Sequence, residues 1–416
     1  MQEQHVTDRK DTMTTHTDPA KQVSEMIKSS VSRRRVMQAA GLGGVVMVAA
    51  ACGAGGDDGS SAAASPASAT DQSATDKVVN WSNWPLYLDV NEETGEYPSL
   101  KAFEAATGIT VTYTEDVNDN NEFYAKVRTQ LEQGQDIGRD LVVLTDWMAG
   151  LWIDNGYAQK LDKANIPNAA NLLPKWQDVS FDPGRQYSLP WQSGFGLLGW
   201  NKAKLKETLG VDTMSSLNQL FDPKLKGRVT LLSEMRDTMG CILAWQGADP
   251  SNFTEDQWQA ALAELTKQID SGQVRQVTGN DYAGALESGD VIAVIGWSGD
   301  MIQLGSDFGI ALPESGGMLW TDNMLIPALA AHKTNAELVM NNYYDPKVAA
   351  EVAAYVQYIC PVAGAQEAIT AIDPALAENP WIFPTTAMLD NSYVFMPLNA
   401  EQEIQYQRDF QKAIGN

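Results

Sequence analysis

The sequence predicts an α/β fold, in which helices pack on the faces of β-sheets. Short runs rich in β-branched and aromatic residues alternate along the chain with longer segments of helical periodicity, a pattern typical of layered α/β proteins. The chain has 416 residues, 44% of them hydrophobic, which is enough to bury the cores of two or three domains. With 20% charged residues, the composition is that of a globular protein rather than a disordered or fibrous one.

Seven β-rich runs predict strands along the chain. They are residues 77–81, 108–114, 140–144, 195–201, 227–232, 291–297 and 323–327. The Gly-rich stretch 187–196 precedes the fourth strand and overlaps it by two residues. We expect this stretch to be extended and to cross between two lobes.

Helical patterns fill the segments between these strands. The predicted helices are 100–107, 121–133, 255–270, 335–343, a segment from 345 to near 360, and 399–413. Gly108 and Gly134 follow the first two, where a helix commonly ends. Capping-box spacing, in which Thr precedes Gln or Glu by three residues, occurs at Thr254 and again at Thr334.

Residues 1–51 are predicted to be an export signal rather than part of the fold. Three arginines, Arg33 to Arg35, precede an apolar run that is interrupted only by Gln38 and ends in three alanines before Cys52. Such a charged and then apolar segment is typical of secretory signals, and the paired arginines indicate the twin-arginine type. The ending resembles a bacterial lipobox, with Ala49 where Leu is usual, and predicts lipidation of Cys52.

The mature protein is therefore expected to be exported and held at the extracytoplasmic face of the cell membrane by a lipid on Cys52. Residues 53–76 contain no large apolar side chain, and we expect them to form a flexible tether. Removal of the signal changes the net charge from −24 to −26 and leaves His332 as the only histidine.

Several classes of function are disfavoured by what the sequence lacks. Acidic residues outnumber basic ones by 53 to 29, which argues against nucleic-acid binding. His332 precedes a predicted helix and is expected to be a solvated surface residue, so His-dependent nucleophilic catalysis is disfavoured. We find no phosphate-binding loop, dinucleotide motif, nucleophile elbow or metal-ligand cluster, and expect no cofactor and no metal.

Cys241 and Cys360 can form a disulfide or remain two separate buried thiols.

Aromatic and acidic residues recur together beside the predicted strands. Ligands bind at the carboxyl ends of strands in open α/β sheets, tryptophan faces attract ammonium groups, and carboxylates form charge-assisted hydrogen bonds with them. If the fold brings these residues together, they would form a binding cleft for an organic polycation. A single Trp at such a place more often packs in the core, an Asp often caps a turn, and Arg236 can pair with a neighbouring acid. The five segments are Trp81-Ser82-Asn83-Trp84, Thr145-Asp146-Trp147, Ser233–Asp237, Trp297–Asp300 and Trp320-Thr321-Asp322.

Together with other segments, these residues resemble the bacterial spermidine/putrescine-binding proteins, the solute-binding components of polyamine ABC importers. The likeness extends from Asn80 to the carboxyl-terminal tail. The segments that carry it include Tyr124-Ala125-Lys126-Val127, Asp140-Leu141-Val142-Val143, Tyr187-Ser188-Leu189-Pro190-Trp191, Gly316–Asp322 and Tyr358-Ile359-Cys360-Pro361-Val362.

The resemblance implies a two-lobed periplasmic-binding-protein fold of type II, each lobe having a central sheet flanked by helices. The first lobe is expected to comprise 77–190 and about 320–367, and the second 191–319 and about 368–416. The resemblance also implies a monomer whose two lobes close on a polyamine. The closed protein is then expected to dock on the permease of an ABC transporter, and this permease works with the transporter's ATPase.

The resemblance also implies the ligand contacts. Glu234 and Asp237 match two acids that hold a terminal amine, and Asp322 matches the acid that holds another amine. Trp81, Ser82 and Trp84 match a first-strand motif of the family. Thr145 and Trp147 match a Ser/Thr and an aromatic residue that contact the ligand. Trp297 and Trp320 match the aromatic walls around the methylene chain.

Two alternatives remain open at this point. The same fold can bind another small solute, such as a different organic cation, an amino acid or a sugar, because sugar sites also use tryptophan walls. A secreted glycosidase with a carboxylate pair is the less favoured alternative. The sequence does not choose between putrescine and spermidine.

Overall fold

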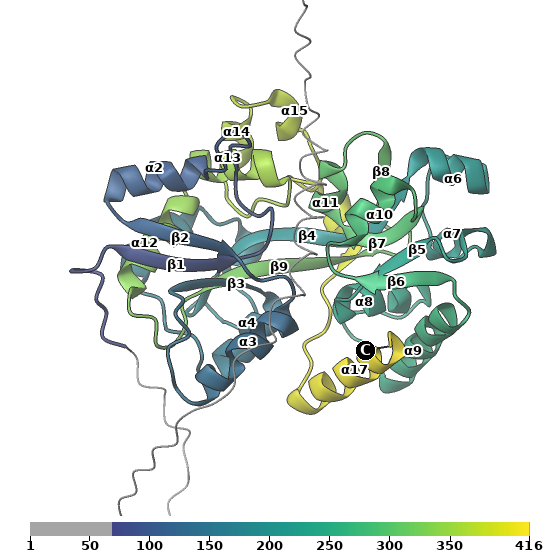
Figure 1. The fold of residues 1–416 in the computed structure, drawn as a ribbon, viewed down its shortest axis with the longest axis horizontal. Coiled ribbons are helices and arrows are strands. Elements are labelled where there is room, and N and C mark those ends of the chain that lie inside the picture. Colours follow the sequence, from purple (N-terminus) through teal and green to yellow (C-terminus); the bar gives the residue numbers. More distant parts are fainter. Residues whose placement is uncertain (1–68, 416) are drawn as a thin grey trace, which may run out of the picture. The chain divides into compact units, whose positions relative to one another are not determined.

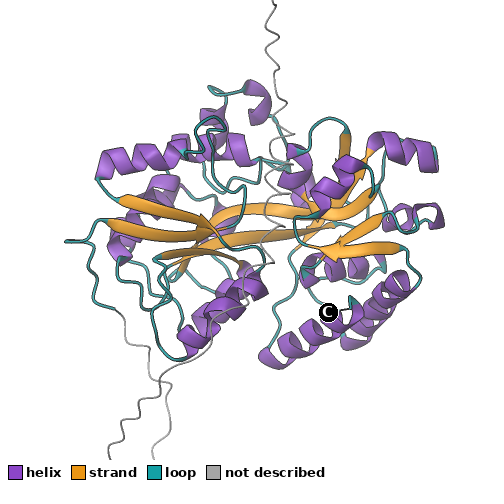
Figure 2. Ribbon diagram, in the orientation of Figure 1, coloured by secondary structure: helices purple, strands orange, loops and turns teal. Residues whose placement is uncertain are grey.

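The computed structural model describes residues 69–415, which lie within one compact unit, residues 61–416. The predicted export signal, Cys52 and the tether up to residue 68 lie outside the described residues. The predicted α/β fold is confirmed: helices flank a ten-stranded mixed sheet (Figures 1 and 2). Its strands are β1 (Val78–Asn83), β2 (Thr110–Glu115), β3 (Leu141–Thr145), β4 (Ser188–Asn201), β5 (Val229–Leu232), β6 (Val274–Thr278), β7 (Ala293–Trp297), β8 (Phe308–Ala311), β9 (Gly317–Leu325) and β10 (Ser392–Tyr393).

The longer helices form the layers on the two faces of the sheet. They are α2 (Pro98–Thr107), α3 (Asn120–Glu132), α4 (Asp146–Asp154), α6 (Lys202–Leu209), α8 (Met235–Trp245), α9 (Glu255–Asp270), α12 (Lys333–Tyr343), α13 (Pro346–Val356) and α17 (Ala400–Ala413). The shorter ones are α5 (Pro174–Gln177), α7 (Leu217–Leu220), α10 (Tyr282–Ser288), α11 (Ser298–Gln303), α14 (Ala365–Ile369), α15 (Pro374–Ala377) and α16 (Thr386–Asp390), with 3-10 turns at Lys163–Asn165, Pro167–Asn171 and Pro223–Leu225.

The order of the strands places two long antiparallel strands at the centre of the sheet. The order is β2-β1-β3-β9-β4-β7-β5-β6, with β10 beside β9 and β8 beside β4. The strands β1, β2 and β3 are parallel to one another, as are β5, β6 and β7. The central pair, β9 and β4, joins these two groups.

Three apolar clusters hold the helices against the sheet. One packs α8, α9 and α17 around β5 and β7. The other two lie on opposite faces of β3, because successive strand side chains alternate between faces. Leu141 and Val143 join one of them, while Val142 and Leu144 join the other.

The three strands that matter most for the site are longer than the sequence pattern predicts. β1 continues two residues beyond the predicted end, to Asn83, and β4 includes the whole extended stretch from Ser188. β9 begins at Gly317 instead of 323. In β4 the glycines and Pro190 weaken the strand pattern. Hydrogen bonds to β9 and then β8 along one side, and to β7 on the other, nevertheless extend the strand.

One of the two predicted capping boxes is confirmed and one is wrong. Thr254 and Gln257 form the reciprocal capping box at the start of α9. The helix after Thr334 begins at Lys333 with no side-chain cap. Glu337 instead accepts hydrogen bonds from the backbone N–H of Asp162 and the side-chain amide of Asn165, both at 2.7 Å.

The prediction of a solvated surface histidine is wrong. The His332 side chain is only 13% exposed, and its Nδ1 lies 2.9 Å from Asp140 while its Nε2 lies 3.3 Å from Asp76. The start of the body packs beside it: Asp71 accepts a hydrogen bond from the Thr334 hydroxyl, and Ser73 is buried. Residues 71–76, expected to belong to the tether, are thus attached to the body by these polar contacts.

The two cysteines of the body are both buried and not joined in a disulfide. Within residues 69–415, none of the helices has both the length and the apolar character needed to cross a membrane. The same residues contain no cluster of His, Cys, Asp or Glu suited to a metal ion.

Trp81 is fully buried against Trp191, Tyr113 and Tyr343, whose ring centroids lie 5.1 to 5.4 Å from its own. The rings of Trp191 and Tyr343 also contact each other, with centroids 5.0 Å apart. Trp81→Ala is expected to lower the free energy of unfolding by about 3–5 kcal/mol, because the cavity left behind cannot collapse fully. Guanidinium unfolding followed by circular dichroism measures this change. Ile404→Ala, at a side chain that is 69% exposed, should cost less than about 0.5 kcal/mol; equal effects of the two substitutions would contradict the core assignment.

Candidate functional site

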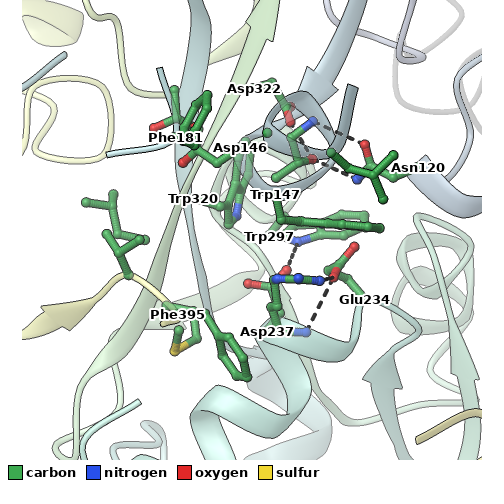
Figure 3. A pocket seen from close by; sticks show the side chains of 18 of the residues that line it. Asn120, Asp146, Trp147, Phe181, Glu234, Asp237, Trp297, Trp320, Asp322 and Phe395 are labelled. Atoms are coloured by element: carbon green, nitrogen blue, oxygen red, sulfur yellow. Dashed lines mark hydrogen bonds and ion pairs between the residues drawn. The ribbon is translucent and has the colours of Figure 1, made fainter. Parts of the chain in front are cut away.

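A cavity of about 640 Å³ lies between the two groups of parallel strands, within the size range of small-molecule sites. Its walls come from the ends of β1, β3 and β7, from the starts of α4 and α8, from the middle of β9, and from the tail before α17. In the view of Figure 3, Asp322 and Asp237 lie toward opposite ends, with Trp320, Trp147 and Trp297 between them.

Asp322 forms the acidic end on the side of β3. Its Oδ1 accepts a hydrogen bond of 2.6 Å from the hydroxyl of Thr145, and its Oδ2 accepts one of 2.9 Å from the hydroxyl of Tyr87. Burial raises the pKa of Asp322 to about 7, against the opposing effect of these two hydrogen bonds. The backbone fixes this arrangement, because Thr145 and Asp322 are directly paired between β3 and β9.

Asp237 forms the acidic end on the side of α8. Its Oδ2 accepts a hydrogen bond of 2.8 Å from the indole N–H of Trp297, and burial raises its pKa to about 7. Gly196 in β4 makes room for this carboxylate, since a Cβ at that position would lie 2.6 Å from Oδ1.

Glu234 stands beside Asp237 at the first turn of α8. Its side chain caps the helix by accepting a hydrogen bond from the backbone N–H of Arg236. Burial raises the pKa of Glu234 to about 8, and the charges of Asp119 and Asp237 act in the same direction. The nearest ion pair is loose, with Nη1 of Arg236 3.9 Å from Oε1 of Glu234.

Two further carboxylates of the cavity are held by neutral donors. Asp146 accepts a hydrogen bond of 2.7 Å from the amide of Asn323, and burial raises its pKa to about 6. Asp300 accepts hydrogen bonds from the hydroxyls of Tyr282 and Tyr358 and from the amide of Asn280. Within residues 69–415, four acids of the cavity have no Lys, Arg or His nitrogen in ion-pair range. They are Asp146, Asp237, Asp300 and Asp322.

The structure brings together most of the residues predicted for the site and leaves two outside. Trp81 points into the core and Ser82 accepts a hydrogen bond from Arg139, so neither lines the cavity. The reason is the length of β1, which continues past Trp81 and places only Trp84 at its end. The predicted residues that line the cavity are Trp84, Thr145, Trp147, Glu234, Asp237, Trp297, Trp320 and Asp322.

Some wall residues were missed by the sequence reasoning. Tyr87 and Tyr358 are remote from the predicted strand ends, although Tyr358 lies in one of the segments that carry the family resemblance. Asp300 follows Trp297 by three residues and was visible in the same strand-end pattern. Arg236 was noticed only as a pairing partner of the acids, yet it lines the cavity.

Chemically, the cavity combines an excess of buried carboxylates with aromatic faces. Such an arrangement suits a ligand that carries positive charge at separated points along an apolar chain. Burying these acids with no cation is unfavourable. A cationic ligand would remove that cost.

Comparison with known proteins gives a family match and several relatives. A sequence profile described as "Bacterial extracellular solute-binding protein" matches residues 99–384. The chain is 27% identical over 316 residues to the "Spermidine/putrescine-binding periplasmic protein" of Escherichia coli, covering 75% of this chain and 86% of that protein. It is 28% identical over 359 residues to the "Putrescine-binding periplasmic protein SpuD" of Pseudomonas aeruginosa, covering 82% and 93%.

A solved structure agrees with these sequence matches. A "Putative spermidine/putrescine ABC transporter from Listeria monocytogenes" superposes with a TM-score of 0.69 at 26% identity, covering 81% of this chain and 98% of that one. The resemblance inferred from the motifs is therefore confirmed, as is the expected type of fold.

The raised pKa values predict how pH affects the ligand-free protein. A carboxyl whose pKa is higher in the folded than in the unfolded state stabilises the fold at low pH, and this stability is lost as pH rises through the folded pKa. Stability should therefore fall as pH rises from about 4, the ordinary pKa of these carboxyls, up to about 6 to 8, the range of the folded pKa values of Asp146, Asp237, Asp322 and Glu234. Thermal unfolding midpoints across this range measure the effect.

The matched control replaces three of these acids by their amides, as Glu234→Gln, Asp237→Asn and Asp322→Asn in one chain. Its midpoint should vary less with pH, because these three groups no longer titrate. The same pH dependence in both proteins would assign the effect to other groups.

Proposed function

Since the chain belongs to the family of bacterial extracellular solute-binding proteins, we propose that it binds a polyamine of the putrescine/spermidine class for an ABC importer. The names of relatives at 27–28% identity that span most of the chain support this ligand class. The protein captures the amine and delivers it to the permease of the transporter, which works with its ATPase, without converting it chemically.

One observation carries the ligand class: Asp237 and Asp322 are buried in a tryptophan-walled cavity, and neither forms an ion pair with a Lys, Arg or His among the described residues. Two ammonium groups would compensate both charges, while the methylene chain between them would lie against the indole rings. An uncharged sugar would leave both acids uncompensated. The same reasoning disfavours a glycosidase, whose substrate is also uncharged.

Within this proposal the wall residues divide by chemistry. Asp322, oriented by Thr145 and Tyr87, binds one ammonium group, and Asp237, oriented by Trp297, binds the other. Trp81 and Ser82 support the site without contacting the ligand. Trp81 packs against Trp191, and Ser82 accepts a hydrogen bond from Arg139. The aromatic walls are Trp84, Trp147, Trp297 and Trp320.

Closure of two lobes is part of the proposal. We assign 77–190 with about 320–367 to the first lobe, and 191–319 with about 368–416 to the second. Separate apolar clusters on the two sides of the cavity support a division into two lobes, with Ile369 and Ile382 packed in the cluster of the first lobe. Opening would let water reach the acids when no ligand is bound, so closure would be coupled to the ligand.

The amino-terminal segment completes the proposal. Residues 1–51 direct export as a twin-arginine signal, and Cys52 then carries the lipid that holds the monomeric protein at the outer face of the cell membrane. The segment from 53 to about 70 leaves the body free to meet its permease.

Asp322→Asn is expected to weaken binding of putrescine and spermidine about 10- to 100-fold, because one charge-assisted hydrogen bond contributes about 1.5–3 kcal/mol. Isothermal titration calorimetry measures the loss. Asp290→Asn, which removes an exposed acid, is the matched control and should bind like the unmodified protein. If the unmodified protein binds neither amine, the proposed ligand class is wrong.

Cys52→Ser is expected to release the protein from the membrane, because serine cannot accept the thioether-linked lipid. Fractionation of cells that express the full chain, with mass spectrometry of the mature amino terminus, measures this change. Ser60→Ala, in the same segment, should leave the protein in the membrane fraction. Membrane retention of both variants would contradict the lipid anchor.

A further inference from the structure

The cavity extends beyond the tryptophans and acids that the proposed function assigns to a diamine. In the view of Figure 3, Phe181 lies to one side of the line that joins Asp322 and Asp237, and Asn120 lies to the other. The volume of about 640 Å³ is in the range of pockets that enclose drug-sized ligands, which are larger than an unbranched diamine. A diamine held between the two acids would therefore leave part of the cavity unfilled.

Apolar side chains from two separate parts of the chain line the cavity away from these acids. One wall comes from α4 and from the loop after α5, and the other comes from the tail segment before α17. Phe181 and Phe395, one from each part, lie on the same side of Trp147 and Trp297 in Figure 3. We call this part of the cavity the side pocket, and its residues are Leu151, Val179, Phe181, Val394, Met396 and Leu398.

Both walls of the side pocket are held in place by the body of the protein. Phe181 packs against α4, where a Cβ on Gly150 would lie 3.3 Å from the Cβ of Phe181. The guanidinium carbon of Arg185 lies 5.7 Å from the ring centroid of Phe181. In the tail, Phe395 packs against Phe253 with ring centroids 5.2 Å apart. The side pocket is thus preformed, and a ligand would not have to order it.

The chemistry of the side pocket differs from that of the part between the two acids. Val394 is 50% exposed, and an apolar side chain exposed within a cleft is stabilised by contact with an apolar ligand group. Asp154 and Lys175 also line the cavity, but both are exposed residues that water can solvate. The six residues of the side pocket offer no carboxylate, so burying a further ammonium group among them would be unfavourable.

We propose that the side pocket binds an apolar substituent of the ligand, so that the cavity takes a polyamine with an alkyl or benzyl-type group on a terminal nitrogen. This inference rests on the proposed polyamine function and narrows its ligand class. The ammonium groups would bind Asp237 and Asp322, and the substituent would lie between Phe181 and the tail. Alkylation leaves the nitrogen basic, so the ligand keeps both positive charges.

Isothermal titration calorimetry with putrescine, N-methylputrescine and N-benzylputrescine gives the first test. The methyl compound controls for substitution at the nitrogen. N-benzylputrescine is expected to bind at least about tenfold more tightly than N-methylputrescine, because its ring is removed from water in the side pocket. Equal or weaker binding would overturn the inference while leaving the polyamine function intact. If none of the three amines binds, the proposed function itself fails.

Substitutions in the two walls give the second test. Phe181→Ser and Val394→Ser should each lower the ratio of N-benzylputrescine affinity to N-methylputrescine affinity at least about fivefold, because each removes apolar contact area. Ile372→Ser is the matched control, since Ile372 is also 50% exposed but does not line the cavity. This control should leave the ratio unchanged.

The variants also show where the substituent binds. An unchanged ratio in both well-folded wall variants would place the benzyl group elsewhere and overturn the inference. Val394→Ser keeps this test decisive if Phe181→Ser fails to fold, because half of the Val394 side chain is already in water. Circular dichroism and thermal unfolding establish that each variant is folded before titration.

Discussion

Burying a carboxylate removes the water that would otherwise solvate its charge. Asp237 and Asp322 are both buried, and within residues 69–415 neither has a Lys, Arg or His nitrogen in ion-pair range. Each has instead a neutral donor that orients it, the indole of Trp297 for Asp237 and two hydroxyls for Asp322. Neutral donors reduce the cost of burial without cancelling the charge. The pocket is therefore electrostatically incomplete until a cation enters, and this incompleteness connects the architecture to ligand capture.

The sheet makes this incomplete pocket possible by bringing two groups of strands to a shared centre. β9 passes from one group to the other and carries Asp322 and Trp320 in its middle, while β4 runs antiparallel beside it. Gly194 and Gly196 of β4 lie against two side chains of the pocket, and a Cβ there would clash with Trp320 and Asp237 respectively. The glycines of β4 thus leave room for two side chains of the pocket, whose lining comes from the neighbouring strands and helices.

Much of the fold and part of the site followed from local patterns. Trp147 and Trp297 were identifiable because each stands at the end of a short, clearly apolar strand. Trp81 was misplaced because β1 continues for two more residues, and a strand side chain in that position packs on the face of the sheet. His332 was expected to be solvated, whereas contacts with Asp76 and Asp140, far away in sequence, hold it.

The sequence by itself determined the class of fold, the positions of most helices and strands, the family resemblance and the kinds of side chain gathered for the ligand. These properties follow from periodicity, capping residues and short motifs, which are local. Only the tertiary structure decided which of those side chains face the cavity, that Tyr87 and Tyr358 join them, and that Arg236 stacks on Trp147. Such contacts depend on strand register and helix packing between distant segments, and no local pattern encodes them.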